Sequence, residues 1–215
     1  METINLNLKE QLEEKKSLFE KNASTHIKKI YREGIDSVRA SGVTKNAKQV
    51  GDLAPDFILQ NATGKNVRLS DYLNKGPVVL IWYRGGWCPY CNITLAKYQQ
   101  ELGKIKEAGA SLLAITPELP DNSLSTKEKN SLEFEVLSDP HNEVAKTYGV
   151  VFKLTPDVAE NYQDNFDLES YNGDSSYELP LGATYVIDSE RIIKYAFLDA
   201  DYRNRAEPKE VINNL

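Results

Sequence analysis

The sequence predicts an α/β sandwich in which helices flank a central mixed β-sheet. Apolar, β-branched runs such as residues 78–83 and 111–116 alternate with helical patterns, and a strand hairpin followed by a helix closes the chain. An apolar fraction of 40% across 215 residues is enough for a hydrophobic core. We expect residues 1–45 to form an N-terminal helical extension and residues 46–215 to form the α/β domain.

The N-terminal segment, residues 3–40, has the spacing of amphipathic helices. Its apolar side chains recur every three or four positions, at Ile4, Leu8, Leu12, Leu18, Phe19, Ile27, Ile30, Tyr31, Ile35 and Val38. Gly34 and the stretch 22–25 are candidate breaks, and Gly42 is a stop signal. Residues 41–50 are polar and predict a linker. The apolar stripe either packs on its own domain or supports a homodimer.

The α/β part begins near Val50, and its elements follow from apolar runs, turn residues and caps. The expected strands are 57–59 and 67–69 as a hairpin around Gly64, then 78–83, 111–116 and 134–137, and a second hairpin of 185–188 with 192–198. The expected helices are a short turn capped by Ser70, then 89–107 stopped at Gly109, 122–131, 142–148 and a last helix from Pro208. Residues 155–179 are polar and weakly periodic, which predicts a loop with a helical turn.

Charge and composition narrow the function classes. The net charge is −6, with +3 in residues 1–50 and −9 in the remainder, and an acidic body argues against a nucleic-acid partner. The sequence contains no run of 18 apolar residues, so we expect no membrane span. Met1–Asn5 lacks the basic and apolar regions of a secretory signal, and two cysteines do not make a disulfide-stapled secreted scaffold. We therefore expect a cytoplasmic protein.

The only two cysteines form the motif Cys88-Pro89-Tyr90-Cys91, at the junction of an expected strand and helix. A helix N-terminus favours a thiolate, and Pro89 suits the first helical position because its missing N–H is not needed there. Arg84, four residues before Cys88, adds a cation. Helix end and cation together stabilise a thiolate by ~1–3 kcal/mol. Such a thiolate attacks a disulfide or a peroxide O–O bond.

Two other interpretations of the cysteines are inert burial and metal binding. Isolated cysteines are often small buried hydrophobes, but a Cys-x-x-Cys between Trp87 and a helix start rarely is. A four-ligand zinc site needs two more ligands, and the chain offers only His26 and His141, without the usual spacing. We expect no metal and no cofactor.

Four segments of the chain resemble peroxiredoxins. Residues 51–57, Gly-Asp-Leu-Ala-Pro-Asp-Phe, resemble the family's opening motif, and residues 81–91, Ile-Trp-Tyr-Arg-Gly-Gly-Trp-Cys-Pro-Tyr-Cys, resemble the stretch that contains its peroxidatic cysteine. Residues 137–150 and 183–188 are similar to later family segments. The resemblance spans about residues 47–200 and is strongest for the peroxiredoxin-like branch of the alkyl hydroperoxide reductase/thiol-specific antioxidant (AhpC/TSA) family.

The resemblance implies a thioredoxin-like fold and an antioxidant thiol peroxidase. Peroxide would oxidise the dithiol to a redox-active Cys88–Cys91 disulfide, and thioredoxin, or glutathione with glutaredoxin, would reduce it again. In this alignment Arg84 replaces the family's shielding proline and Cys88 its threonine. The family's later arginine would fall near Gly182 and is absent. Arg84 either takes over peroxide activation or is an exposed loop cation.

The resemblance also gives supporting residues. We expect Trp87 to cover the motif and Thr184 to present its backbone near the sulfurs. The charged segment 199–208 is interpreted as a structured loop and helix start with no catalytic role.

The sequence leaves the attacking sulfur and the reaction open. By analogy with thioredoxin, Cys88 attacks and Cys91 resolves; by alignment with peroxiredoxins, Cys91 attacks and Cys88 resolves. The first hypothesis is a thiol peroxidase acting on hydrogen peroxide or alkyl hydroperoxides. The alternatives are a thiol-disulfide oxidoreductase acting on protein disulfides and a redox-inert module that dimerises through its N-terminal helices.

Overall fold

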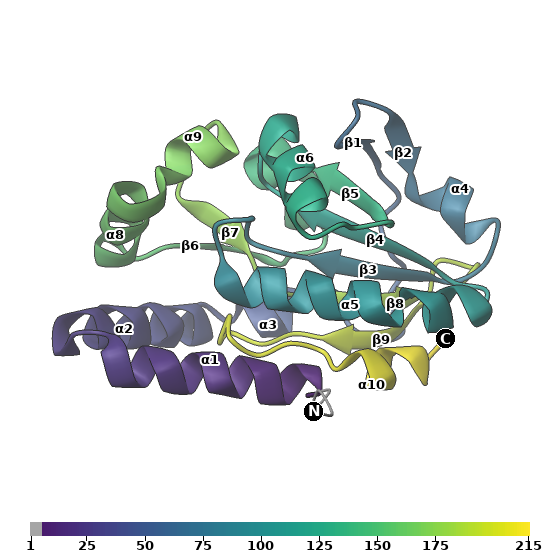
Figure 1. The fold of residues 1–215 in the computed structure, drawn as a ribbon. Coiled ribbons are helices and arrows are strands. Elements are labelled where there is room, and N and C mark those ends of the chain that lie inside the picture. Colours follow the sequence, from purple (N-terminus) through teal and green to yellow (C-terminus); the bar gives the residue numbers. More distant parts are fainter. Residues whose placement is uncertain (1–5) are drawn as a thin grey trace.

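A seven-stranded mixed sheet forms the centre of the computed structural model, which describes residues 6–215 (Figure 1). The strand order is β2-β1-β5-β4-β3-β8-β9. The strands are β1 (Ile58–Asn61), β2 (Asn66–Arg68), β3 (Val78–Trp82), β4 (Ser111–Thr116), β5 (Glu135–Ser138), β8 (Thr184–Ile187) and β9 (Ile193–Phe197). Strands β3, β4 and β5 are parallel, and the two predicted hairpins flank them in antiparallel pairing. The predicted α/β fold with a mixed sheet is confirmed.

Strand β3 is buried on both faces, which explains its uninterrupted apolar sequence. Val78, Leu80 and Trp82 face one hydrophobic cluster, whereas Val79 and Ile81 face the other. Successive side chains of a strand point to opposite faces, so a strand covered on both sides needs apolar residues at every position. The strand therefore supplies a rigid base for the loop that follows it.

Helices cover both faces of the sheet (Figure 1). On one face lie α1 (Leu8–Asn22), α5 (Pro89–Glu107) and α10 (Pro208–Ile212), and on the other lie α3 (Val43–Asn46), α4 (Leu69–Leu73), α7 (Glu143–Thr147) and α8 (Pro156–Phe166). The remaining elements are α2 (Thr25–Ser41), α6 (Pro120–Lys129), a 3₁₀ turn (Pro140–Asn142), α9 (Leu168–Asn172) and a small sheet of β6 (Val151–Lys153) with β7 (Glu178–Pro180). No helix in residues 6–215 combines the length and apolar character needed to cross a bilayer.

The N-terminal pattern splits into two helices at one of the expected breaks. Helix α1 ends at Asn22, and the Ser24 side chain caps α2 by accepting the N–H of Ile27 at 3.2 Å. Gly34 lies inside α2, and Gly42 ends it with a φ of 74°. Ile4 and the predicted lack of a signal in Met1–Asn5 fall outside the described residues.

Most of the apolar stripe of the N-terminal helices packs on its own chain. Leu8 and Leu12 are buried in the cluster that contains α5, and Ile30, Ile35 and Val38 of α2 are buried as well. Burial within the chain removes these five side chains from the surface. Leu18 of the same stripe is 54% exposed, so a small part of the stripe stays uncovered.

Two short segments differ from the sequence predictions. Residues 41–50 are not simply a linker, because α3 forms within them and buries Val43 and Ala47 in the core; the predicted boundary at residue 45 falls inside this helix. Ser70 does not cap α4, because Arg68 occupies the N-cap position. The backbone N–H and hydroxyl of Ser70 instead donate to the Asp56 carboxylate at 3.0 and 2.9 Å.

The predicted loop at 155–179 is wrong, since this segment contains α8, α9 and β7. Helix α8 buries only a narrow stripe that includes Val158 and Tyr162, so most of its sequence is polar. It packs partly on α2, where the Tyr31 hydroxyl donates to the Asn161 side chain at 2.6 Å. A helix that packs on another helix through one stripe gives a weak apolar signal. This correction matters because Tyr162 lies at the dithiol.

Candidate active site

The two cysteines lie where β3 passes into α5. As predicted, α5 begins at Pro89, so Cys88 is its N-cap residue and Cys91 lies in its first turn. Both thiols are free and buried. The first turn of a helix has N–H groups without helical partners and a partial positive charge, which favours an anion there.

The Cys91 sulfur receives hydrogen bonds from three directions. The backbone N–H of Arg84 and the Nη2 of Arg205 each donate to Cys91 Sγ at 3.4 Å. The Cys88 thiol donates the third. Burial by itself would raise the pKa of Cys91, but the Cys88 hydrogen bond and the charges of Arg205 and Arg84 hold that pKa well below its usual value. Cys91 is therefore the sulfur that ionises.

Cys88 has the opposite electrostatics. Burial, its hydrogen bond to Cys91 and the negative charge there raise the pKa of the Cys88 thiol well above its usual value. The pair thus carries one negative charge on Cys91 and one proton on Cys88. These opposite shifts are the arrangement that the peroxiredoxin alignment expects, with Cys91 as the more acidic thiol.

Arg205 was missed by the sequence analysis, which assigned no catalytic role to residues 199–208. Its guanidinium also donates to the carbonyl oxygens of Tyr202 and Asn204. A Cβ on Gly182 would lie 2.5 Å from Arg205 Cζ. The guanidinium thus fills the space beside Gly182, the position at which the family's arginine is absent. The missing arginine at Gly182 was the one feature of the sequence that could have indicated that a cation from another segment occupies this space.

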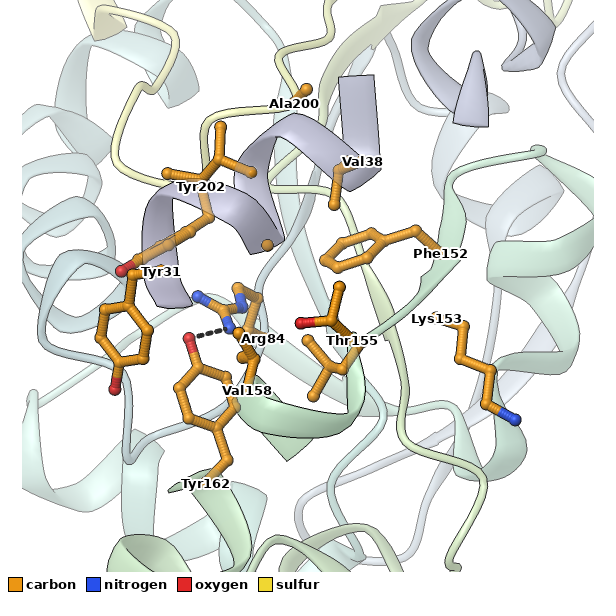
Figure 2. A pocket seen from close by; sticks show the side chains of 13 residues that line it. Tyr31, Val38, Arg84, Phe152, Lys153, Thr155, Val158, Tyr162, Ala200 and Tyr202 are labelled. Atoms are coloured by element: carbon orange, nitrogen blue, oxygen red, sulfur yellow. Dashed lines mark hydrogen bonds between the residues drawn. The ribbon is translucent and has the colours of Figure 1, made fainter. Parts of the chain in front are cut away.

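Arg84 is not an exposed loop cation, because it is only 1% exposed. Its guanidinium lies 4.2 Å from the ring centroid of Tyr202, 5.0 Å from that of Trp87 and 5.1 Å from that of Tyr162. Nη2 donates to the Tyr162 hydroxyl at 2.7 Å (Figure 2). The side chain reaches no sulfur by a hydrogen bond, so Arg84 acts on Cys91 through its backbone N–H and its charge.

Arg84 lines two cavities of different kinds. The smaller, of about 20 Å³, lies between α2 and α8 and has room for about one water molecule (Figure 2). The larger is a cleft of about 500 Å³, within the range of small-molecule sites. It is lined by Cys88 and by the aromatic side chains Phe19, Tyr31, Trp87, Tyr90, Tyr162, Phe166 and Tyr202. Cys91 does not line it, so Cys88 is the sulfur that faces the cleft.

The other predicted residues occupy distinct places. Trp87 packs on Tyr162 and Phe166 at centroid distances of 5.1 and 5.3 Å, beside the motif. Thr184 is buried at the start of β8 and is paired in register with Ile81 of β3. The side chains that donate hydrogen bonds to Cys91 are those of Arg205 and Cys88. His26 is exposed on α2, and His141 contacts Asp174 at 3.2 Å. Residues 6–215 contain no group of three side chains arranged to hold a metal ion.

Glu118 is a second buried group that the sequence analysis missed. Its carboxylate accepts the backbone N–H of Gly86 at 2.8 Å, in the loop that leads to Cys88. Burial, together with the negative charge of Cys91, raises the pKa of Glu118 to about 7. Glu118 therefore changes its charge near neutral pH, beside the sulfur.

Gly182→Ala tests the placement of Arg205. The added methyl group displaces the guanidinium from Cys91, so the Cys91 pKa is expected to rise, by about one pH unit if ~1.4 kcal/mol of stabilisation is lost. The ultraviolet absorbance of the thiolate as a function of pH measures this. Gly103→Ala on α5 is the control, because a Cβ there meets nothing within 4 Å. An unchanged midpoint in Gly182→Ala would show that Arg205 does not stabilise the thiolate.

Glu118→Gln tests the buried carboxyl through the pH dependence of stability. A folded-state pKa of about 7, above the usual 4.5, means that the folded protein binds the proton more tightly than the unfolded chain. This contribution to stability is complete below about pH 4.5 and is lost as the pH rises through about 7. Between pH 4.5 and 8, the free energy of unfolding of wild type, measured in urea, should fall by up to about 3 kcal/mol more than that of Glu118→Gln. Glu128→Gln, on the exposed face of α6, is the control and should have the same pH dependence of stability as wild type. The same pH dependence in Glu118→Gln would contradict the raised pKa of Glu118.

Known proteins are similar to this chain in sequence and in fold. The chain matches the AhpC/TSA family over residues 50–196. It is 36% identical over 100 residues to a putative peroxiredoxin bcp of Buchnera aphidicola, covering 46% of this chain and 63% of that protein. It is 32% identical over 110 residues to the thiol-disulfide oxidoreductase ResA of Bacillus thuringiensis, covering 50% of this chain and 62% of that protein.

The fold is also similar to that of solved structures. The crystal structure of peroxidoxin BcpB from Mycobacterium tuberculosis superposes with a TM-score of 0.61 at 23% identity, covering 77% of this chain and 95% of that one. The chain spans about three fifths of the length of the two curated relatives above. Since the family match extends over more than half of its residues, the chain belongs to the AhpC/TSA family.

Proposed function

We propose that this protein is a thiol peroxidase that reduces hydrogen peroxide or alkyl hydroperoxides with its Cys88/Cys91 dithiol. The observation that supports it best is the Cys91 sulfur, which accepts hydrogen bonds at 3.4 Å from both the Arg84 backbone and the Arg205 guanidinium. Only the thiolate attacks an O–O bond, so a site that keeps one sulfur ionised meets the first chemical requirement. Membership of the AhpC/TSA family agrees with this reaction.

The proposed reaction has two steps. The Cys91 thiolate attacks one peroxide oxygen, the O–O bond breaks, and the leaving oxygen takes a proton to become an alcohol or water. Cys91 is then a sulfenic acid. The Cys88 thiol attacks the Cys91 sulfur, a disulfide forms and water leaves. The two thiols thereby supply the two electrons that the peroxide accepts.

Reduction of the disulfide restores the enzyme. Cys88 lines the cleft and Cys91 does not, so an incoming thiol would attack Cys88 and release Cys91 as a thiolate. The low pKa of Cys91 makes it the better leaving group. Thioredoxin, or glutathione with glutaredoxin, is the proposed source of electrons.

A second candidate function is thiol-disulfide exchange with proteins. The observation that favours it is the position of Cys88 in the lining of an aromatic cleft of about 500 Å³, the side from which a partner would approach the dithiol. The similarity to ResA points the same way. The third hypothesis, a module that dimerises through its N-terminal helices, is weakened because most of their apolar stripe is buried within the chain and, in residues 6–215, only Leu18 of it is exposed.

Single cysteine variants separate the two reactions. In stopped-flow measurements Cys91→Ser should abolish the reaction with peroxide, whereas Cys88→Ser should still react once and accumulate a sulfenic acid on Cys91, detectable by mass spectrometry. The reason is that Cys91 holds the negative charge and Cys88 holds the proton. The reverse pattern would assign the attack to Cys88. Reduction of insulin disulfides without turnover of peroxide would replace the peroxidase by the second function.

Arg84→Met tests the charge of Arg84 while leaving its backbone N–H in place. Loss of the charge should raise the Cys91 pKa and slow the peroxide reaction at pH 6 by about tenfold per ~1.4 kcal/mol lost. Arg84→Lys keeps the charge and should retain most of the rate. Equal rate constants for wild type and Arg84→Met would remove Arg84 from the mechanism.

A further inference from the structure

Two buried guanidinium groups surround the dithiol without a carboxylate partner. Arg84 is 1% exposed and Arg205 is 8% exposed. Arg84 donates to the Tyr162 hydroxyl, and Arg205 donates to two carbonyl oxygens and to Cys91 Sγ. No carboxylate in residues 6–215 forms an ion pair with either of them. The Cys91 thiolate is the anion that Arg205 contacts, and the charge of Arg84 also stabilises it.

Arg203, two residues away in the same loop, shows the contrast. It pairs with the carboxylate of Asp201 at 2.8 Å and lies 3.7 Å from that of Glu20. Acidic side chains of the loop and of α1 thus pair with Arg203, which is partly exposed, whereas none of these pairs with Arg205, which contacts the sulfur. Glu118, the buried carboxyl near the motif, bonds to the Gly86 N–H and not to a guanidinium.

Oxidation removes this one negative charge. When Cys88 and Cys91 form a disulfide, neither sulfur is ionised, and both guanidiniums stay buried without an anion. A buried charge that loses its partner is strongly destabilising. The structure thus favours the dithiol over the disulfide. The cause is the two guanidinium groups, which have no other anion to contact.

We propose that the Cys88–Cys91 disulfide is a strong oxidant of thiols, which monothiols such as glutathione reduce without a thioredoxin-type dithiol. The inference rests on the proposed dithiol-disulfide cycle and names the class of its reductant. One glutathione thiolate attacks Cys88 Sγ, the S–S bond breaks, and Cys91 leaves as a thiolate beside Arg205. A second glutathione thiolate attacks the glutathione sulfur of the mixed disulfide; oxidised glutathione leaves and Cys88 takes a proton. Two thiols have then given two electrons.

The equilibrium with glutathione tests this directly. Wild type, Arg205→Met, Arg205→Lys and Arg203→Met are equilibrated in mixtures of reduced and oxidised glutathione, and the dithiol fraction is counted by alkylation and mass spectrometry. Wild type should have an equilibrium constant for reduction at least about a hundredfold larger than that of thioredoxin measured alongside, or about 60 mV. The equilibrium constant of Arg205→Met should be lower than that of wild type by about tenfold or more, and that of Arg205→Lys should be lowered less. The constant of Arg203→Met should change by less than about twofold.

A second measurement needs no variant. The free energy of unfolding in urea is compared for wild-type protein in its dithiol and disulfide forms at pH 7. The dithiol form should be the more stable, although a disulfide usually stabilises the protein that contains it. A more stable disulfide form, or a constant no larger than that of thioredoxin, would overturn the inference. Neither measurement uses peroxide, so a strongly oxidising disulfide without peroxide turnover would refute only the proposed peroxidase, and turnover with a thioredoxin-like constant would refute only this inference.

Discussion

The contact between the Cys91 sulfur and buried positive charge is the constraint on which the site depends. Arg205 donates to the sulfur at 3.4 Å, and Arg84 adds a second cation that no carboxylate in residues 6–215 neutralises. A guanidinium stays protonated even when buried, so the site's adjustable charge is on the thiols and on Glu118. The lowered pKa of Cys91 follows from these charges, whereas burial and the negative charge of Cys91 raise the pKa values of Cys88 and Glu118.

The surrounding fold is organised so that these cations can be buried. Strand β3 and helix α5 fix the loop between them, and Gly182 leaves the space that the Arg205 guanidinium occupies. Arg84 is enclosed by the rings of Trp87, Tyr162 and Tyr202, which offer it cation–π contacts in place of water. Aromatic rings solvate a cation without neutralising it. The positive charge therefore remains available to the sulfur.

Segments outside the family match build much of the cleft. The match covers residues 50–196, whereas Phe19 and Tyr31 come from the N-terminal helices and Tyr202 from the C-terminal loop. Phe19 stacks on Tyr31 at 5.6 Å, and Tyr31 packs edge-on against Tyr162. The N-terminal helices thus form a wall beside Cys88, which gives them a part in shaping what reaches the dithiol.

The sequence by itself determined the alternation of strands and helices, both hairpins and the dithiol at a strand-to-helix junction, because apolar periodicity and turn residues act over short distances along the chain. It did not reveal α8, whose single buried stripe packs partly on α2 and leaves a mostly polar sequence. Only the tertiary structure gave the two thiols opposite pKa shifts. The pKa of a buried thiol depends on charges within a few ångströms, and the chain brings Arg205 to Cys91 from 114 residues away.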